Sequence, residues 1–339
     1  MEDQVLKKSV VEPTLTHNAT FILLHDRGSS GAEFQNAICN ALLPNLVRQV
    51  APGARFVFPD GPLVDPTVGR DWYDLEYPQQ EGSEAASLDQ WTHVMYAAEQ
   101  VDIVVKDEER LIGREKIFLG GVGKGCAIAL MTLLEMDRPI GGFIGFGGWM
   151  PFIKDIKDVA TLGMIQTPNP PFSQNGQYNQ GGNGGMDPGQ GNGFVDPRML
   201  SIQNDQQQQP FPQAVFPTPM LAHPDQSAWA QHKRVAHFLR MFQWNEASRF
   251  RYENEFGTAT PIVLMHSSND ELVNPLCAIQ AEMVLTELGY GVKLRETNSG
   301  HVITRQVLGD LISTLIQILP LSNASLKSDL TTFMINSTT

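Results

Sequence analysis

Short apolar runs alternate along the chain with longer segments whose apolar residues recur at helical spacing. Six runs read as strands, because each is a compact apolar stretch closed by glycine, proline or polar turn residues: 20–26, 55–62, 116–121, 140–150, 260–268 and 292–299. Segments with helical spacing lie between them, at 32–50, 87–112, 123–136, 226–244, 275–289 and 302–320. This alternation predicts one α/β domain with a mostly parallel sheet and helices on both faces.

The composition changes sharply in one place. Residues 167–219 consist largely of Gln, Asn, Gly and Pro, and such a segment cannot bury enough apolar surface to offset its ordering entropy. We therefore expect a disordered insertion there, within a domain that spans 18–320. Residues 1–17 are expected to form a flexible leader and residues 321–339 a flexible tail.

Charge and cysteine content exclude several classes of function. The net charge of −13 argues against nucleic acid or an anionic membrane as the main partner. Neither a signal peptide nor a membrane span is expected, so the sequons at Asn18, Asn323 and Asn336 are interpreted as chance matches. Three scattered cysteines favour a reducing compartment and no disulfide framework, which predicts a cytoplasmic protein and leaves a nuclear location open. No metal-ligand spacing is present, and no cofactor is expected.

In a parallel sheet the site lies at the carboxyl ends of the strands. That rule selects four loops: 25–31, 121–125, 267–274 and 297–301. The second loop, Gly121-Val122-Gly123-Lys124-Gly125, admits three interpretations. A dinucleotide fingerprint lacks its last glycine, and a phosphate loop would need Ser or Thr after Lys124. A nucleophile elbow G-x-S-x-G fits the spacing, although its serine is replaced by Gly123.

The other two loops favour the elbow. Asp270 follows the strand at 260–268, and His301 follows the last strand at the start of the last helix. The order elbow, Asp, His is that of the α/β-hydrolase triad. Each residue alone would be an ordinary turn or cap residue, but all three features in this order are a much less common coincidence.

Six motifs now make the resemblance specific. The chain resembles the acyl-protein thioesterase branch of the phospholipase/carboxylesterase family of α/β hydrolases over most of residues 18–152 and 226–320. HDRGSSG stands where the family has HGxGxxG, and GVGKG stands where it has GxSQG. The sequence also holds WYD at 72–74, GGWMP at 147–151, HSSNDELV at 266–273 and GH at 300–301.

The resemblance implies a role for each matching residue. Asp270 would orient the imidazole of His301, which would be the general base, and the backbone N–H groups of Arg27 and Lys124 would form the oxyanion hole. Trp72 and Trp149 would line an acyl pocket or simply pack beside the cleft.

The nucleophile position is Gly123, and three further departures also fall at the presumed site: Asp at 26, Lys at 124 and Gly at 147. The elbow residue has a strained backbone that glycine tolerates, but glycine has no atom that can attack an acyl carbon. Cys126 and the loop serines are weaker candidates for a replacement nucleophile, since none occupies the elbow. The loop serines are Ser29, Ser30, Ser267 and Ser268.

Three hypotheses follow. The first is a hydrolase-like protein impaired in catalysis, which binds an acyl ester, a thioester or an acylated protein. The second is an active ester or thioester hydrolase that uses an unusual nucleophile or a water. The third is an interaction protein acting through the insertion at 167–219. The sequence leaves the oligomeric state open.

Overall fold

The structure is a computed structural model, and it describes most of the chain outside the predicted insertion. The described residues are 6–42, 50–65, 69–74, 77, 88–162, 227–242, 257–318 and 323–338. The low-complexity insertion predicted at 167–219 lies outside these residues and stays a prediction.

A seven-stranded sheet forms the centre of the domain. Its strands follow the order β1-β3-β2-β6-β7-β8-β9. Their bounds are β1 Lys8–Val11, β2 Ala19–Leu24, β3 Ala54–Pro59, β6 Ile117–Val122, β7 Gly142–Phe146, β8 Ile262–Ser267 and β9 Val292–Thr297. Six strands run parallel and β1 pairs antiparallel with β3 at one edge. The mostly parallel sheet predicted from the apolar runs is therefore confirmed.

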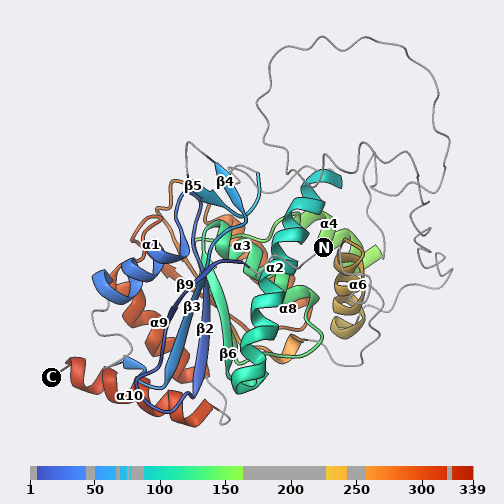
Figure 1. The fold of residues 1–339 in the computed structure, drawn as a ribbon. Helices are drawn as coiled ribbons and strands as arrows, with labels where there is room; N and C mark the ends of the chain where they lie inside the picture. Colours follow the sequence, from blue (N-terminus) through green and yellow to red (C-terminus); the bar gives the residue numbers. More distant parts are fainter. Residues whose placement is uncertain are drawn as a thin grey trace, which may run out of the picture. The chain divides into compact units, whose positions relative to one another are not determined.

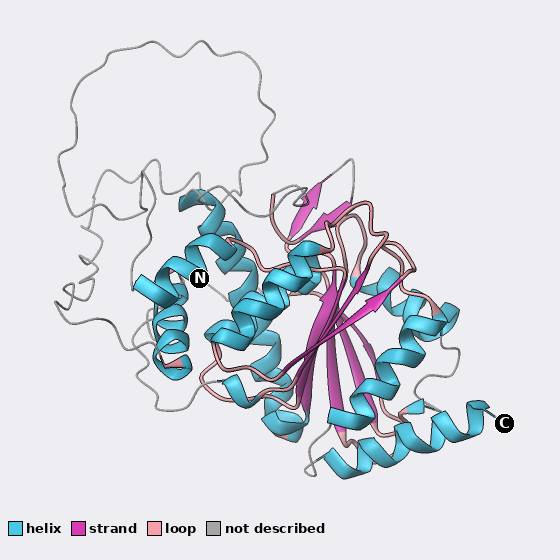
Figure 2. Ribbon diagram, turned by 180° about the vertical axis from the view of Figure 1, so that it is seen from behind, coloured by secondary structure: helices cyan, strands magenta, loops and turns pink. Residues whose placement is uncertain are grey.

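Helices cover both faces of this sheet (Figures 1 and 2). One face carries α1 (Gly31–Asn36), α9 (Arg305–Ile318) and α10 (Ala324–Thr338), and the other carries α2 (Leu88–Ile112), α3 (Lys124–Glu135), α4 (Ile153–Leu162), α6 (Ala228–Arg240) and α8 (Leu276–Glu287). Two covered faces explain the near-continuous apolar strands, since every residue of β6, β7 and β8 is buried. Aromatic rings bridge neighbouring strands in the core: Phe21 stacks on Phe56 at 5.1 Å and on Phe118 at 4.8 Å.

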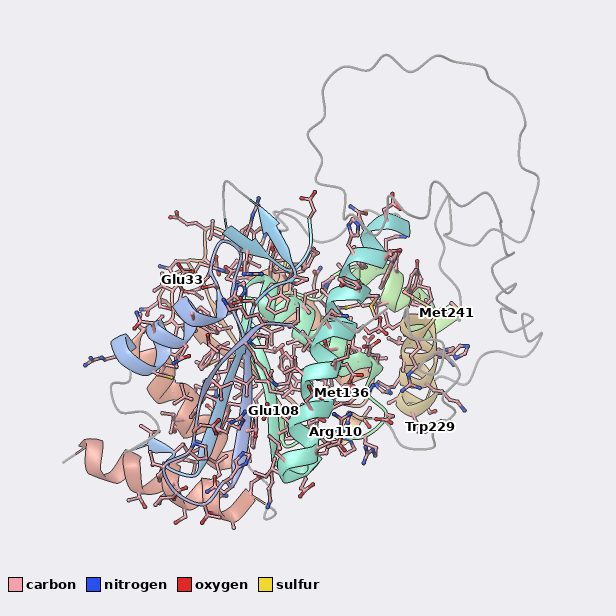
Figure 3. The ribbon with its side chains drawn as sticks, in the orientation of Figure 1. Glu33, Glu108, Arg110, Met136, Trp229 and Met241 are labelled. Atoms are coloured by element: carbon pink, nitrogen blue, oxygen red, sulfur yellow. The ribbon has the colours of Figure 1, made fainter. Side chains whose placement is uncertain are left out.

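The flexible leader predicted at 1–17 is wrong at residues 8–11. Lys8–Val11 forms the edge strand β1, in register with residues 56–59 of β3. Lys8 Nζ donates to Glu108 Oε1 at 3.2 Å, and Glu108 lies on α2, where Figure 3 labels it. Arg55 Nε donates to the other oxygen of Glu108 at 2.9 Å. Four residues with a lysine at one end are too short a pattern to predict a strand, so the pairing comes from tertiary context.

The flexible tail predicted at 321–339 is also wrong. Residues 324–338 form α10, whose Leu326 and Leu330 are 1% and 3% exposed and belong to the core under α9. The side chain of Asn18 donates to Ser325 Oγ at 2.9 Å and to Asp329 Oδ2 at 3.1 Å, which ties the start of β2 to this helix. Helix α10 has a weak apolar stripe, and its two anchoring leucines gain their burial from α9 and the sheet.

Three further elements were not predicted. They are α4 and the two short strands β4 (Leu63–Asp65) and β5 (Gly69–Asp71), which pair antiparallel with each other. The helix predicted at 32–50 begins as α1 and continues as a π-helical stretch at Ala37–Leu42, beyond which residues 43–49 lie outside the described part.

Candidate functional site

The predicted elbow joins β6 to α3 at Gly123. This residue has φ 52° and ψ −119°, in the left-handed half of the backbone map that favours glycine. Its N–H donates to Phe146 O at 3.0 Å, which fixes the turn against β7. Gly125, two positions on, lies so close to the loop after β2 that an added Cβ would stand 2.4 Å from His25 O. The spacing of small residues around the turn therefore reflects close packing of two backbones.

Asp270 lies in the turn that follows β8. Its Oδ1 accepts from the N–H groups of Leu272 and Val273, both at 2.9 Å, and its side chain is fully buried. Oδ2 accepts from His301 Nδ1 at 2.7 Å. His266 Nε2 approaches the same carboxylate at 3.4 Å and lies 3.0 Å from Val273 O. The structure thus brings the predicted Asp270 and His301 into direct contact, with the carboxylate orienting the ring.

The second nitrogen of His301 also faces a carboxylate. His301 Nε2 lies 3.0 Å from Oδ2 of Asp26. Burial lowers the pKa of His301, but its hydrogen bonds and charge interactions with Asp26 and Asp270 raise that pKa more, so the net shift is upward. Since carboxylates only accept, both ring nitrogens must donate, and the arrangement calls for an imidazolium.

Asp26 was named among the departures at the presumed site, but no role was predicted for its side chain. Its Oδ1 accepts from the N–H of Arg27 at 2.8 Å and from the N–H of Lys124 at 2.9 Å. Its Oδ2 accepts from Tyr77 Oη at 3.0 Å as well as from His301. The two backbone donors named for the oxyanion hole therefore converge on one atom, and that atom belongs to the chain's own carboxylate.

The carboxylate of Asp26 fits because Gly123 has no side chain. A Cβ built on Gly123 would stand 2.1 Å from Asp26 Oδ1 and 2.3 Å from its Cγ. Carbon atoms do not approach oxygen this closely without a bond, so a serine at 123 and the observed position of Asp26 exclude each other. The observed position of the Asp26 carboxylate therefore depends on glycine at position 123.

A buried ion pair fixes the elbow from below. The Lys124 side chain is 1% exposed, and its Nζ donates to Asp71 Oδ2 at 2.7 Å and to Tyr73 O at 3.0 Å. Arg27 Nε lies 3.5 Å from the same carboxylate oxygen. Burial raises the pKa of Asp71, and this effect exceeds the opposing influence of Lys124, Trp72 N–H and Arg27. Lys124 therefore anchors the turn through its side chain while its N–H points at Asp26.

The aromatic residues have different positions. Trp72 is 1% exposed and its Nε1 donates to His25 O at 2.7 Å, so it supports the loop from beneath. His25 is buried too, with Nδ1 2.7 Å from Asp26 O and Nε2 accepting from Gly61 N at 2.9 Å. Trp149 lies edge-on to Tyr77 at 5.8 Å, and Tyr77 lies 5.9 Å from the His301 ring. Tyr77 was missed because the sequence around it gives no motif.

Three of the candidate replacement nucleophiles, Cys126, Ser30 and Ser267, are poorly placed. Cys126 is buried, and burial raises the pKa of its thiol to about 12, so almost no thiolate forms at neutral pH. Ser30 caps α1, where its Oγ accepts from Glu33 N at 3.2 Å. Ser267 donates to Asn269 Oδ1 at 2.6 Å and also accepts from Gly300 N. Among the described residues, no group of three His, Cys, Asp or Glu side chains could hold a metal ion.

Comparison with known proteins supports the family resemblance at low identity. The model of the phospholipase/carboxylesterase family matches residues 6–168, which include Asp26 and the elbow but end before Asp270 and His301. Acyl-protein thioesterase 1 homolog 1 of Dictyostelium discoideum is 27% identical over 157 residues, an alignment that covers 43% of this chain and 65% of that protein.

Solved structures extend the likeness to the whole fold. Esterase PE8 matches with a TM-score of 0.53 at 17% identity, covering 93% of this chain and 99% of its own. Arabidopsis thaliana SOBER1 matches with a TM-score of 0.51, also at 17% identity, over 92% and 99%. The chain has the α/β-hydrolase fold that was predicted. None of the helices in the described part is long and apolar enough to cross a membrane.

Proposed function

We propose that this protein is an acyl-protein thioesterase-like or carboxylesterase-like pseudo-hydrolase. The observation that carries the proposal is Gly123 at the elbow, which has no nucleophilic atom and lies against the Asp26 carboxylate that occupies His301 Nε2. Loss of the nucleophile from a Ser-His-Asp triad costs on the order of 10⁶ in kcat. What remains is a folded centre with its orienting carboxylate and histidine, and no route to an acyl-enzyme.

Two further features support loss of acyl transfer. The arrangement around His301 favours its protonated form, so the ring has no free lone pair with which to activate a water. The backbone donors that would stabilise a tetrahedral oxyanion already bind the Asp26 carboxylate. Slow hydrolysis through water is therefore disfavoured as well, because Asp26 occupies both His301 Nε2 and the two backbone donors.

The proposed role is binding. The ligand class indicated by the family resemblance is an acyl ester, a thioester or an acylated protein, and the aromatic pair Tyr77 and Trp149 lies beside the centre. The alternative of an active hydrolase with an unusual nucleophile has no favourable observation among the described residues, because Cys126 is buried and the loop hydroxyls of Ser30 and Ser267 serve as caps and turn donors.

The test is hydrolysis of a short acyl thioester and of a p-nitrophenyl ester, together with labelling by a fluorophosphonate probe. We expect neither turnover nor labelling for the natural chain. His301→Ala is the matched control variant, because hydrolysis by a trace contaminant would be the same in both preparations. Robust turnover that His301→Ala abolishes would refute the proposal, and a probe adduct mapped to Cys126 or a loop serine would establish the alternative.

A further inference from the structure

The centre holds a carboxylate where a hydrolase would hold a developing oxyanion. Resting on the proposed function, we propose that the oxyanion hole persists as a carboxylate-binding site and that Asp26 is its built-in ligand. The ligand class of the site is a small monocarboxylate. The side chain of Asp26 occupies the site permanently only because position 123 is glycine.

Four donors define this site. Two are backbone N–H groups, of Arg27 and Lys124, and the second belongs to the first residue of α3, where the helix dipole favours an anion. The other two are His301 Nε2 and Tyr77 Oη, each 3.0 Å from the second oxygen. Both oxygens of Asp26 accept twice, which satisfies a single carboxylate and leaves it 19% exposed.

The donors come from segments far apart in the sequence. Arg27 follows β2 together with the acceptor Asp26, Lys124 follows β6 and His301 follows β9, so one carboxylate joins three strand ends of the sheet. A site assembled in this way recognises the carboxylate group itself, whichever molecule carries it. If the tether at Asp26 is removed, an external carboxylate of similar size should take the same four bonds.

The tether explains why no external anion should bind the natural chain. A carboxylate attached one residue from its own donor has a very high effective concentration, so a free carboxylate at millimolar concentration cannot displace it. The natural chain is therefore expected to be insensitive to formate and acetate. A vacant anion site would instead respond to both salts, so this insensitivity distinguishes a site filled by Asp26 from an empty one.

The first experiment measures thermal unfolding in sodium formate, sodium acetate and sodium chloride at equal ionic strength. Asp26→Gly should unfold at a lower temperature in chloride and recover with formate in a saturable way. The natural chain and Asp310→Ala, which removes an exposed carboxylate on α9, should show equal curves in all three salts. If Asp26→Gly does not fold in chloride, the recovery of folded protein with formate is the same readout. Lack of any formate effect on Asp26→Gly, or an equal effect on the natural chain, would overturn the proposal.

The second experiment locates the ligand. In ¹H–¹⁵N spectra of Asp26→Gly, formate should shift the amide signals of Lys124 and Arg27, because those N–H groups would bind it. Shifts confined to residues far from the elbow would contradict the site.

The third experiment tests the dependence on Gly123 with a fluorophosphonate probe. Gly123→Ser alone should stay unlabelled, because its Cβ collides with Asp26, whereas Asp26→Gly/Gly123→Ser should label at position 123. Equal labelling of the single and double variants would refute the proposed occupancy of the hole while leaving the pseudo-hydrolase proposal intact. Labelling of the natural chain would instead refute the proposed function.

Discussion

Replacing Lys124 by methionine tests how the elbow is held. The substitution keeps much of the side-chain volume but removes an ammonium group that is 1% exposed and 2.7 Å from Asp71 Oδ2. Breaking a buried ion pair by removing one partner costs about 3–5 kcal/mol, because the other charge stays buried. Asp71 keeps its bond from Trp72 N at 2.7 Å and its contact with Arg27 at 3.5 Å, so the lower end applies. We expect a loss of about 3 kcal/mol.

The second variant of this test removes both charges. Lys124→Met/Asp71→Asn keeps an oxygen that can accept from Trp72 N but leaves no uncompensated carboxylate, so it should recover about 2 kcal/mol of the loss. Urea unfolding at pH 7 measures both values, provided that the m-value stays constant. The deficit of the single variant should shrink as pH falls, because removing Lys124 raises the pKa of Asp71 further and protonation then relieves the buried charge.

Two results would refute this reasoning. A cost below about 1 kcal/mol for Lys124→Met would mean that the pair contributes no more than an exposed one. A stability loss in the double variant equal to the sum of the losses in Lys124→Met and in Asp71→Asn alone would mean that the two side chains act independently.

Three further predictions concern the site and the ends of the chain. The pKa of His301 is raised in the folded chain, so its imidazolium contributes its full stabilisation below the unfolded pKa near 6.5, and this contribution is lost as pH rises through the folded pKa. His301→Gln should therefore flatten the curve of unfolding free energy against pH in this range. A curve that keeps its shape in the variant would contradict the prediction. Gly145→Ala should cost about 1–3 kcal/mol because its Cβ would stand 2.5 Å from Cys126 Sγ, and Cys126→Ala should relieve the loss, as chemical unfolding would reveal. Leu326→Ala should cost about 2–5 kcal/mol in the same assay, whereas a flexible tail would predict no change.

The sequence predicted the sheet, and it indicated a candidate site at the strand ends, because both depend on local patterns. Apolar runs located the strands, and the rule for the carboxyl ends of parallel strands then placed Gly123, Asp270 and His301 together. The position of the Asp26 carboxylate could not be predicted in this way. It depends on which rotamer the side chain adopts and on the distance between two loops 98 positions apart in the sequence.

Other features were missed for a related reason. Tyr77 stands alone in a loop, and its hydroxyl acquires meaning only from the carboxylate that it binds. The strand at Lys8–Val11 and the helix at Ala324–Thr338 have weak patterns of their own and are stabilised by partners distant in sequence. Tertiary context overrides local propensity most easily in such short or weakly amphipathic segments.

The contact between Gly123 and Asp26 also couples the two positions to each other. An elbow Cβ would lie 2.1 Å from Asp26 Oδ1, so a side chain at position 123 and the carboxylate in its present place cannot coexist. The four hydrogen bonds that Asp26 accepts therefore depend on a residue that makes none of them. A substitution at position 123 would change the environment of His301 without touching the imidazole, through the carboxylate that lies between them.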